Sequence, residues 1–144
     1  IRIVDHLLSD QELHQLIASA AAYVSPHRSE GLGLTVVEAM GAGVPVISTP
    51  FSGLGSLIRE DTALPVRYDR VELPADYFPY PRGFVWANPD VASLARRLRE
   101  VVETPEEVRS RTDHARQQVT DYFCSDRLVE SYRAEIERLD GLAG

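Results

Sequence analysis

Two glutamates, Glu30 and Glu38, lie on either side of a glycine-rich turn in the stretch HRSEGLGLTVVEAMGAGVPVIS. The turn precedes an apolar run with helical spacing, and the N-terminus of a helix carries a partial positive charge that stabilises nearby carboxylates. Carboxylates also accept hydrogen bonds from sugar hydroxyls, often two at once. The residues by themselves therefore allow two interpretations. Either Glu30 caps the helix and Glu38 is a solvated surface residue, or both bind a ligand.

The expected geometry brings both carboxylates to one small volume. Glu30 lies in the turn after a strand, and a helix that begins at or beside Gly33 places Glu38 in its second turn. Helical side chains lean toward the helix N-terminus, so we expect Glu38 to point back at the turn. Gly31 and Gly33 allow a ligand to approach the main chain, where free N–H groups can bind phosphates. Hydroxyl-binding acids beside a phosphate-binding helix start suit a nucleotide-linked sugar.

The elements that must position this turn alternate between strands and helices. Short β-branched or apolar runs predict strands at residues 1–4, 21–27 and 44–50. Capping residues and helical spacing predict helices near residues 9–20, 34–43, 55–60, 90–103, 105–123 and 125–139. This alternation predicts an α/β fold with a Rossmann-like parallel sheet flanked by helices, in which ligands bind beyond the carboxyl ends of the strands. The glutamate turn follows the second strand and is expected at that edge.

The composition is that of a globular domain without a nucleic-acid partner. The chain has 144 residues, 44% of them hydrophobic, and a net charge of −7, and it contains no basic patch. All 15 basic residues are arginine, which is typical of a GC-rich genome, and we expect a bacterial protein. The single cysteine, Cys124, excludes an internal disulfide and is expected to be a small buried side chain. No run is apolar enough to span a membrane and no signal peptide is visible, so we expect a cytoplasmic protein.

Residues 64–86 depart from the alternation of strands and helices. They are rich in proline and aromatic residues, and we expect an insertion of extended segments and loop that packs on its surroundings. For Trp86 and the neighbouring aromatic rings, packing is favoured over stacking on a base. The histidines have no partners at metal-ligand spacing, so no metal site is expected.

The stretch SPHRSEGLGLTVVEAMGAGVPVIST resembles the signature of a large family of retaining glycosyltransferases of the GT-B fold, glycosyltransferase family 4 or the group 1 type. The mark of that family is two glutamates separated by seven residues, and the G-x-G-L turn, EAM and G-V-P-V-I follow here in order. Ser52, Gly53 and VWANPD at residues 85–90 extend the resemblance to nearly the whole chain. Residues 1–144 are therefore expected to be most of the C-terminal, nucleotide-sugar-binding domain of a longer two-domain enzyme, with C-terminal helices over residues 90–140.

The resemblance implies transfer of a sugar from a nucleotide-diphosphate sugar to an acceptor, with retention of configuration. Glu30 would be the catalytic residue nearest the reacting centre, and Glu38 would bind the ribose. The donor-binding residues that the resemblance implies are Glu30, Gly31, Gly33, Leu34, Thr35 and Glu38. His27 and Arg28, on the same turn, are further candidates.

The resemblance also implies the partners of the protein. No cofactor or metal would be required, and the sequence has no Asp-x-Asp metal motif. GDP-mannose is the first donor to consider by analogy. The acceptor would be a glycan or a lipid-linked saccharide, bound mainly by an N-terminal domain, in a branch that includes cell-surface polysaccharide synthesis. The full-length enzyme would be cytoplasmic and peripheral at the inner membrane face.

Two departures from the family pattern qualify these expectations. The arginine and lysine that neutralise the diphosphate in such enzymes would lie before Ile1, so the chain alone is expected to be inactive. Leu54 and Ser56 stand where the nearest branch has polar residues. Two alternatives therefore stay open, a non-catalytic nucleotide-sugar-binding or scaffolding module and a nucleotide-sugar epimerase of the same fold.

Overall fold

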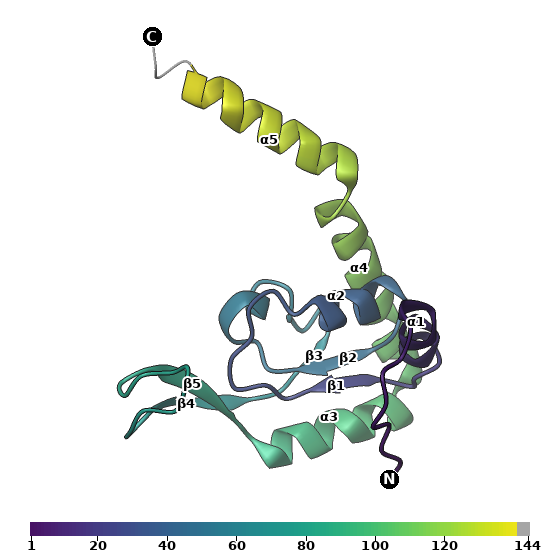
Figure 1. Ribbon diagram of the computed structural model, residues 1–144. Coiled ribbons are helices and arrows are strands. Elements are labelled where there is room, and N and C mark those ends of the chain that lie inside the picture. Colours follow the sequence, from purple (N-terminus) through teal and green to yellow (C-terminus); the bar gives the residue numbers. More distant parts are fainter. Residues whose placement is uncertain (141–144) are drawn as a thin grey trace.

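A three-stranded parallel sheet forms the centre of the molecule. The structure is a computed structural model that describes residues 1–140. The strands are β1 (Tyr23–Ser25), β2 (Val46–Ser48) and β3 (Leu64–Pro65), and they lie side by side in that order. All three run parallel, with helices above and below them (Figure 1). The predicted Rossmann-like α/β fold is thereby confirmed.

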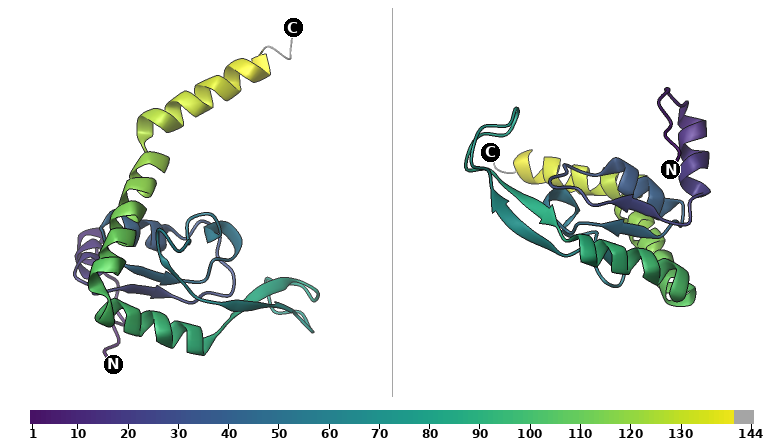
Figure 2. Two further views of the ribbon diagram at one scale, coloured as in Figure 1. Left: turned by 180° about the vertical axis from the view of Figure 1, so that it is seen from behind. Right: turned by 90° about the horizontal axis from the view of Figure 1, so that it is seen from below.

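Helices cover both faces of the sheet. α2 (Leu34–Gly41) lies on one face and α3 (Val91–Glu103) on the other, above and below the strands in Figure 1. α4 (Pro105–Tyr122) packs against both of them, and α1 (Asp10–Ala18) packs against α2. α5 (Ser125–Asp140) continues beyond α4 and projects away from the sheet (Figure 2).

Local sequence signals account for the starts of these helices. Ser9 and Glu12 form a reciprocal capping box at α1, in which the Ser9 N–H donates to the Glu12 carboxylate at 2.8 Å. The Asp90 side chain accepts the N–H of Ser93 and caps α3. Pro105 occupies the first turn of α4, where its missing N–H costs nothing. The three helices therefore begin where the sequence predicts.

The alternation of side chains along β2 divides the core into two layers. Val46 packs in a cluster that includes Met40 of α2, whereas Ile47 packs on the opposite side with Leu64 and, from α3, Leu94. Neighbouring residues of a strand point to opposite faces. Because helices cover both faces, both residues must be apolar, which explains the continuous apolar run VPVI.

Most of the proline-rich segment forms an antiparallel hairpin with a long connecting loop. β4 (Tyr68–Glu72) pairs with β5 (Val85–Pro89) along its whole length. The hairpin leaves the body after β3 and extends beyond the carboxyl edge of the sheet (Figures 1 and 2). Extended segments were expected there, but their pairing was not, because residues 73–84 connect the strands without the short turn that signals a hairpin in a sequence.

Two predicted elements are wrong. Residues 1–4 form no strand, since no strand in the described range 1–140 pairs with their backbone groups. Residues 55–60 form no helix, and the short 3₁₀ helix η1 (Ser52–Leu54) precedes them instead. The N–H groups of Leu57 and Ile58 both donate to the Leu54 carbonyl, at 3.0 Å each. The apolar residues of this stretch thus close a turn over the core rather than continue a helix.

Cys124 corrects a further expectation, because its side chain is exposed rather than buried. It lies between α4 and α5, where the chain leaves the packed body.

None of the helices within residues 1–140 has the length and apolar content that a membrane crossing requires.

Candidate functional site

The chain between β1 and α2, residues 26–33, is named here the glycine turn, and it ends in a left-handed glycine. Gly33 has a φ of +67° and immediately precedes Leu34, the first residue of α2, as predicted. The N–H groups of Val36 and Val37 both donate to the Gly33 carbonyl, at 2.9 and 3.0 Å. The N–H groups of Leu34 and Thr35 donate to no acceptor among residues 1–140. They are therefore available to an anion at the positive end of the helix.

Glu30 lies in the glycine turn without capping α2. Its side chain is half-buried, and its Oε1 accepts the N–H of the adjacent Gly31 at 2.9 Å. The start of α2 makes no side-chain cap hydrogen bond. The geometry thus gives no support to the interpretation of Glu30 as a helix cap, and the carboxylate is held at the turn by its own main chain.

Glu38 lies in the second turn of α2 and is not a solvated surface residue. Its Oε2 is inaccessible to solvent and has no hydrogen-bond partner among residues 1–140. Thr49, directly after β2, is completely buried, and its Oγ1 also has no partner there. An unpaired buried polar atom costs about 1–3 kcal/mol, so its presence calls for an explanation such as a ligand or a bound water.

A contact between two glycines fixes the shape of the glycine turn. A Cβ atom on Gly53 would lie 1.4 Å from the carbonyl oxygen of Gly31, which no side chain can do. The Gly53 N–H donates to the Glu30 carbonyl at 3.1 Å. Ser52 adopts a φ of +60° to bring η1 into this position. The loop after β2 is therefore pressed directly onto the residues beside Glu30.

Leu54 supports the helix start from below. Its side chain is completely buried, and a Cβ on Gly33 would lie 2.6 Å from its Cδ2. Leu54, which replaces the polar residue expected from the family pattern, therefore packs against the first turn of α2. Ser56 lies two residues beyond it, and its carbonyl accepts a hydrogen bond from Arg59 at 2.9 Å.

His27 is turned toward the protein. Its Nδ1 lies 3.2 Å from the Ser25 carbonyl and its Nε2 lies 3.3 Å from the Phe51 carbonyl. The ring therefore bridges the two chain segments that follow β1 and β2. This contact gives His27 a positioning role for the turn.

Arg28 faces the hairpin. Its guanidinium carbon lies 5.3 Å from the centre of the Trp86 ring, within cation–π range. Its carbonyl accepts the N–H of Ala87 at 2.8 Å. Arg28 therefore links the glycine turn to β5, and its side chain is exposed beside the turn.

The structure adds Gly53 and Thr49 to the residues that the sequence indicates. Gly53 is visible in the sequence only as part of the Ser-Gly pair, since its contact with Gly31 joins residues that lie far apart in the chain. Thr49 has a weaker signal, a polar residue directly after a buried strand, at the edge where such folds bind ligands.

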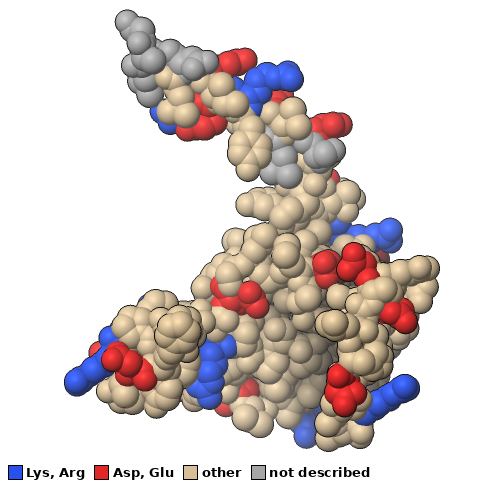
Figure 3. All heavy atoms as spheres, viewed as in Figure 1, with Lys and Arg blue, Asp and Glu red and all other residues tan. Residues whose placement is uncertain are grey.

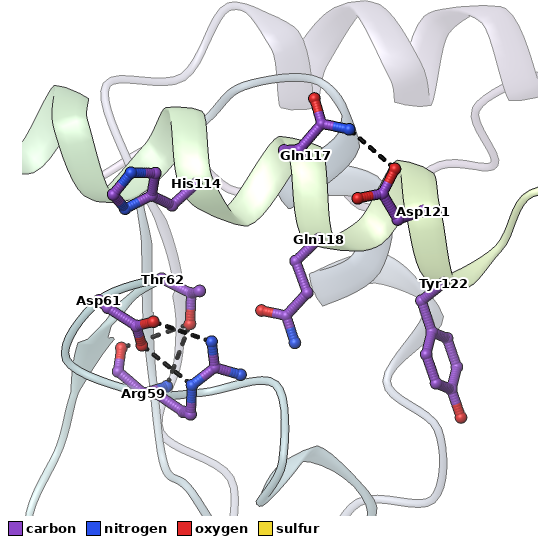
Figure 4. Close-up of a pocket in the computed structure, with 8 residues that line it drawn as sticks. All are labelled: Arg59, Asp61, Thr62, His114, Gln117, Gln118, Asp121 and Tyr122. Carbon is purple, nitrogen blue, oxygen red and sulfur yellow. Dashed lines mark hydrogen bonds and ion pairs between the residues drawn. The ribbon is translucent and has the colours of Figure 1, made fainter.

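A hollow away from the glycine turn lies between α4 and the loop that leads into β3. It has a volume of about 440 Å³, and Arg59, Asp61, His114 and Gln118 are among its lining residues (Figure 4). The Arg59 guanidinium donates to Asp61 from Nε and Nη2, at 2.9 Å each, and lowers the pKa of that carboxyl. Arg59 and Asp61 neutralise each other, and the hollow lies next to the start of β3 rather than at the carboxyl edge. Among residues 1–140, no group of three or more His, Cys, Asp or Glu side chains is placed to hold a metal ion.

Comparison with known proteins identifies the family. The sequence model of the family described as Glycosyl transferases group 1 matches residues 4–118. The chain belongs to this family. The matched range contains the whole glycine turn, both glutamates and the strands that flank them, so the resemblance seen in the sequence is confirmed.

The chain also matches curated proteins over part of their length. The chain is 44% identical over 54 residues to "Sulfoquinovosyl transferase SQD2" of Arabidopsis thaliana, covering 38% of this chain and 11% of that protein. It is 31% identical over 122 residues to "Glycogen synthase" of Mycobacterium tuberculosis, covering 85% and 25%. It is 29% identical over 116 residues to "MMP alpha-(1->4)-mannosyltransferase" of Mycolicibacterium hassiacum, covering 81% and 24%. The chain thus spans a quarter or less of the length of these relatives.

Proposed function

We propose that this chain binds a nucleotide-diphosphate sugar at the start of α2 and serves a retaining glycosyltransferase. One observation carries the proposal. The two unpaired N–H groups of Leu34 and Thr35 and the unpaired, buried Oε2 of Glu38 belong to the first two turns of the same helix. Phosphate oxygens are acceptors and ribose hydroxyls are donors, so a nucleotide diphosphate satisfies both kinds of group together.

The proposed roles follow the order of groups along such a donor. The N–H groups near Gly33, Leu34 and Thr35 bind the diphosphate, and Glu38 accepts hydrogen bonds from the ribose. Glu30, within the glycine turn, contacts the hydroxyls of the donor sugar. In the transfer step an acceptor hydroxyl loses its proton and its oxygen bonds to the sugar, while the bond between the sugar and the diphosphate breaks and negative charge grows on the departing diphosphate. The helix start stabilises that charge.

The donor sugar and the acceptor are proposed from the relatives. Their names include a glycogen synthase, an α-mannosyltransferase and a sulfoquinovosyl transferase, so the family members that align with this chain differ in the sugar that they transfer. GDP-mannose is our first donor for testing. The proposed acceptor is a glycan or a lipid-linked saccharide, and no metal is assigned a role.

Nucleotide binding is tested by titrating GDP, UDP and GDP-mannose into the isotope-labelled chain and following its amide NMR signals. We expect millimolar, saturable binding with the largest shifts at Leu34 and Thr35. Glu38→Ala should weaken the binding of GDP and of GDP-mannose about tenfold, the effect of losing roughly 1.4 kcal/mol. Glu103→Ala, which removes an exposed carboxylate from α3, is the matched control and should change neither.

A substitution at Glu30 distinguishes the proposed sugar contact of Glu30 from the proposed ribose contact of Glu38. Glu30→Gln should weaken the binding of GDP-mannose and leave that of GDP unchanged, because only the sugar contacts this residue. Equal losses for both ligands would contradict the assignment of Glu30 to the sugar. Failure of any nucleotide to shift the signals of Leu34 and Thr35 would overturn the proposed site as a whole.

A further inference from the structure

The β4–β5 hairpin, residues 68–89, presents an unusual density of aromatic rings to solvent. Here it is named the aromatic arm. Phe78 is completely exposed, and Tyr77 and Phe84 are 51% and 42% exposed. Burying one such ring stabilises a protein by about 1.5–3 kcal/mol, yet these rings lie on an element that projects beyond the sheet (Figure 2). Their position calls for a binding partner rather than a role in the core.

The rings in the far part of the arm pack against one another. Trp86 lies 6.1 Å from Tyr77 and 6.2 Å from Tyr80, measured between ring centres. Tyr80 in turn lies 5.3 Å from Phe84. Main-chain hydrogen bonds between Leu73 and Phe84 and between Tyr77 and Tyr80 hold the far part of the arm in a defined shape. Tyr77 and Phe84 are therefore supported by other rings, whereas Phe78 projects into solvent.

The arm is attached to the glycine turn at one point. The Ala87 N–H donates to the Arg28 carbonyl, and the Arg28 guanidinium lies over the Trp86 ring. Ala87 is completely buried at this junction. Glu30, which we propose to contact the donor sugar, follows Arg28 by two residues. The aromatic cluster therefore begins beside the turn at which the sugar would be transferred.

The charges of the arm indicate which kind of ligand suits these rings. Both signs occur on its surface (Figure 3), from three acids and two arginines: Asp69, Glu72, Asp76, Arg70 and Arg82. A surface so nearly balanced does not attract a polyanion such as a nucleic acid or an anionic membrane. Rings that carry apolar faces and, in tyrosine, a polar tip suit a ligand with C–H faces and neutral hydroxyls.

We propose that the aromatic arm binds neutral hexose chains by stacking them on Tyr77, Phe78 and Phe84. Its role as an acceptor-binding surface beside the donor site rests on the proposed function, whereas saccharide binding by the rings does not. A chain that lies along the arm toward Arg28 presents one end to the glycine turn. The arm thereby gives this domain a share in holding the acceptor.

Trp86 is the only tryptophan of the chain and reports directly on the arm. Maltoheptaose and an α-linked mannose hexamer are titrated separately into the chain, and Trp86 fluorescence and the amide signals of residues 77–86 are recorded. We expect a saturable response in the millimolar range to at least one of the two. Phe78→Ala and Tyr77→Ala should each weaken that response about tenfold or more, and Tyr77→Phe, which keeps the ring, should retain it. Tyr132→Ala, which removes an exposed tyrosine from α5, should leave it unchanged.

Each contrary outcome is distinct. Absence of a response to both saccharides overturns the inference, as does a response that survives the loss of Phe78 and Tyr77. Binding to phosphatidylcholine or phosphatidylglycerol vesicles that Phe78→Ala abolishes, without saccharide binding, assigns the arm to a membrane instead. GDP titrations of the same variants keep the two proposals apart. Saccharide binding with no nucleotide binding refutes the donor site alone, and the reverse refutes the arm alone.

Discussion

The glycine turn and the aromatic arm lie at the same edge of the sheet but are built in opposite ways. The turn derives its shape from missing side chains, because Gly53 touches the carbonyl of Gly31 and Gly33 rests on Leu54. The arm derives its surface from large side chains that the rest of the described chain leaves uncovered. An added Cβ should therefore be costly at Gly53 and Gly33, where the packing is tight, whereas we expect the arm to lose an exposed ring without losing its fold.

This difference suits the two proposed ligands. A diphosphate is small and is bound by main-chain N–H groups, whose positions depend on a rigid turn. A saccharide chain is long and uniform, and broad rings can bind it without a closed pocket. Stability and binding should consequently respond together in the turn and separately in the arm.

The largest effect is expected for Gly53→Ala. The added Cβ would lie 1.4 Å from the Gly31 carbonyl oxygen, so the loops after β1 and β2 must separate. We expect a loss of about 4 kcal/mol or more in the free energy of unfolding, measured by urea denaturation. Gly31→Ala is the matched control, because a Cβ at Gly31 meets no atom within 4 Å. A small effect of Gly53→Ala would mean that the two loops are not in contact.

Leu54→Ala should be the next most damaging change. It removes a completely buried side chain from beneath Gly33, and such changes cost about 2–5 kcal/mol. The exposed Leu34, the first residue of α2, offers the same chemical change outside the core, and Leu34→Ala should cost less than about 0.5 kcal/mol. Thermal and urea unfolding of the two variants provide the measurement. Similar losses at both positions would contradict the packing role of Leu54.

The sequence predicts the glycine turn well because its determinants are local. An apolar strand, glycines, and an apolar helical run follow one another within 25 residues, and β1, Gly33 and α2 occur where they indicate. The contact of Gly53 with Gly31 is not predictable in this way, since it depends on two loops meeting at the sheet edge. The role of Leu54 is likewise not predictable from the sequence, where it differs from the polar residue of the family pattern, whereas in the structure it is a core residue.

The sequence predicts the arm and the N-terminal residues less well. Prolines and aromatic residues indicate extended chain between residues 64 and 86, but the pairing of β4 with β5 is set by main-chain hydrogen bonds that these residues do not encode locally. The run IRIV has a strand-like composition and yet forms no strand, because strand formation needs a partner as well as a propensity. Elements whose structure depends on distant partners are therefore those that the sequence describes least well.

An ion-pair network between α3 and α4 should give a moderate, pH-dependent effect. Arg97 of α3 donates to the Pro65 carbonyl at 3.0 Å and, together with Arg111 of α4, pairs with Glu100. Burial acts to raise the pKa of Glu100, but the Arg97 hydrogen bond and the charges of both arginines outweigh it and lower the pKa below its usual 4.5. This contribution to stability is therefore present above pH 4.5 and is lost as the pH falls through the lower value of the folded state.

The acid-dependent loss should amount to about 1 kcal/mol. Urea unfolding at a series of pH values provides the measurement. Glu100→Gln should be less stable near neutral pH and should show a shallower decline below pH 4.5, whereas Glu103→Gln, an exposed position on the same helix, should follow the parent chain. An unchanged acid decline in Glu100→Gln would exclude this carboxyl as its source.

The smallest effect on stability is expected for Phe78→Ala. This variant tests whether binding and stability respond separately in the arm, unlike in the glycine turn. Phe78 is completely exposed, so its loss should change the free energy of unfolding by less than about 0.5 kcal/mol. Trp86→Ala, in contrast, removes the ring that contacts Tyr77, Tyr80 and Arg28, and should cost about 1 kcal/mol or more. Urea unfolding of both variants, followed by circular dichroism, tests the pair.

Because Phe78→Ala is also expected to weaken saccharide binding, an unchanged stability together with weaker binding would show that its exposed ring serves a ligand and not the fold. A marked loss of stability would instead place Phe78 in a packed surface and remove the main reason for assigning the arm to a ligand.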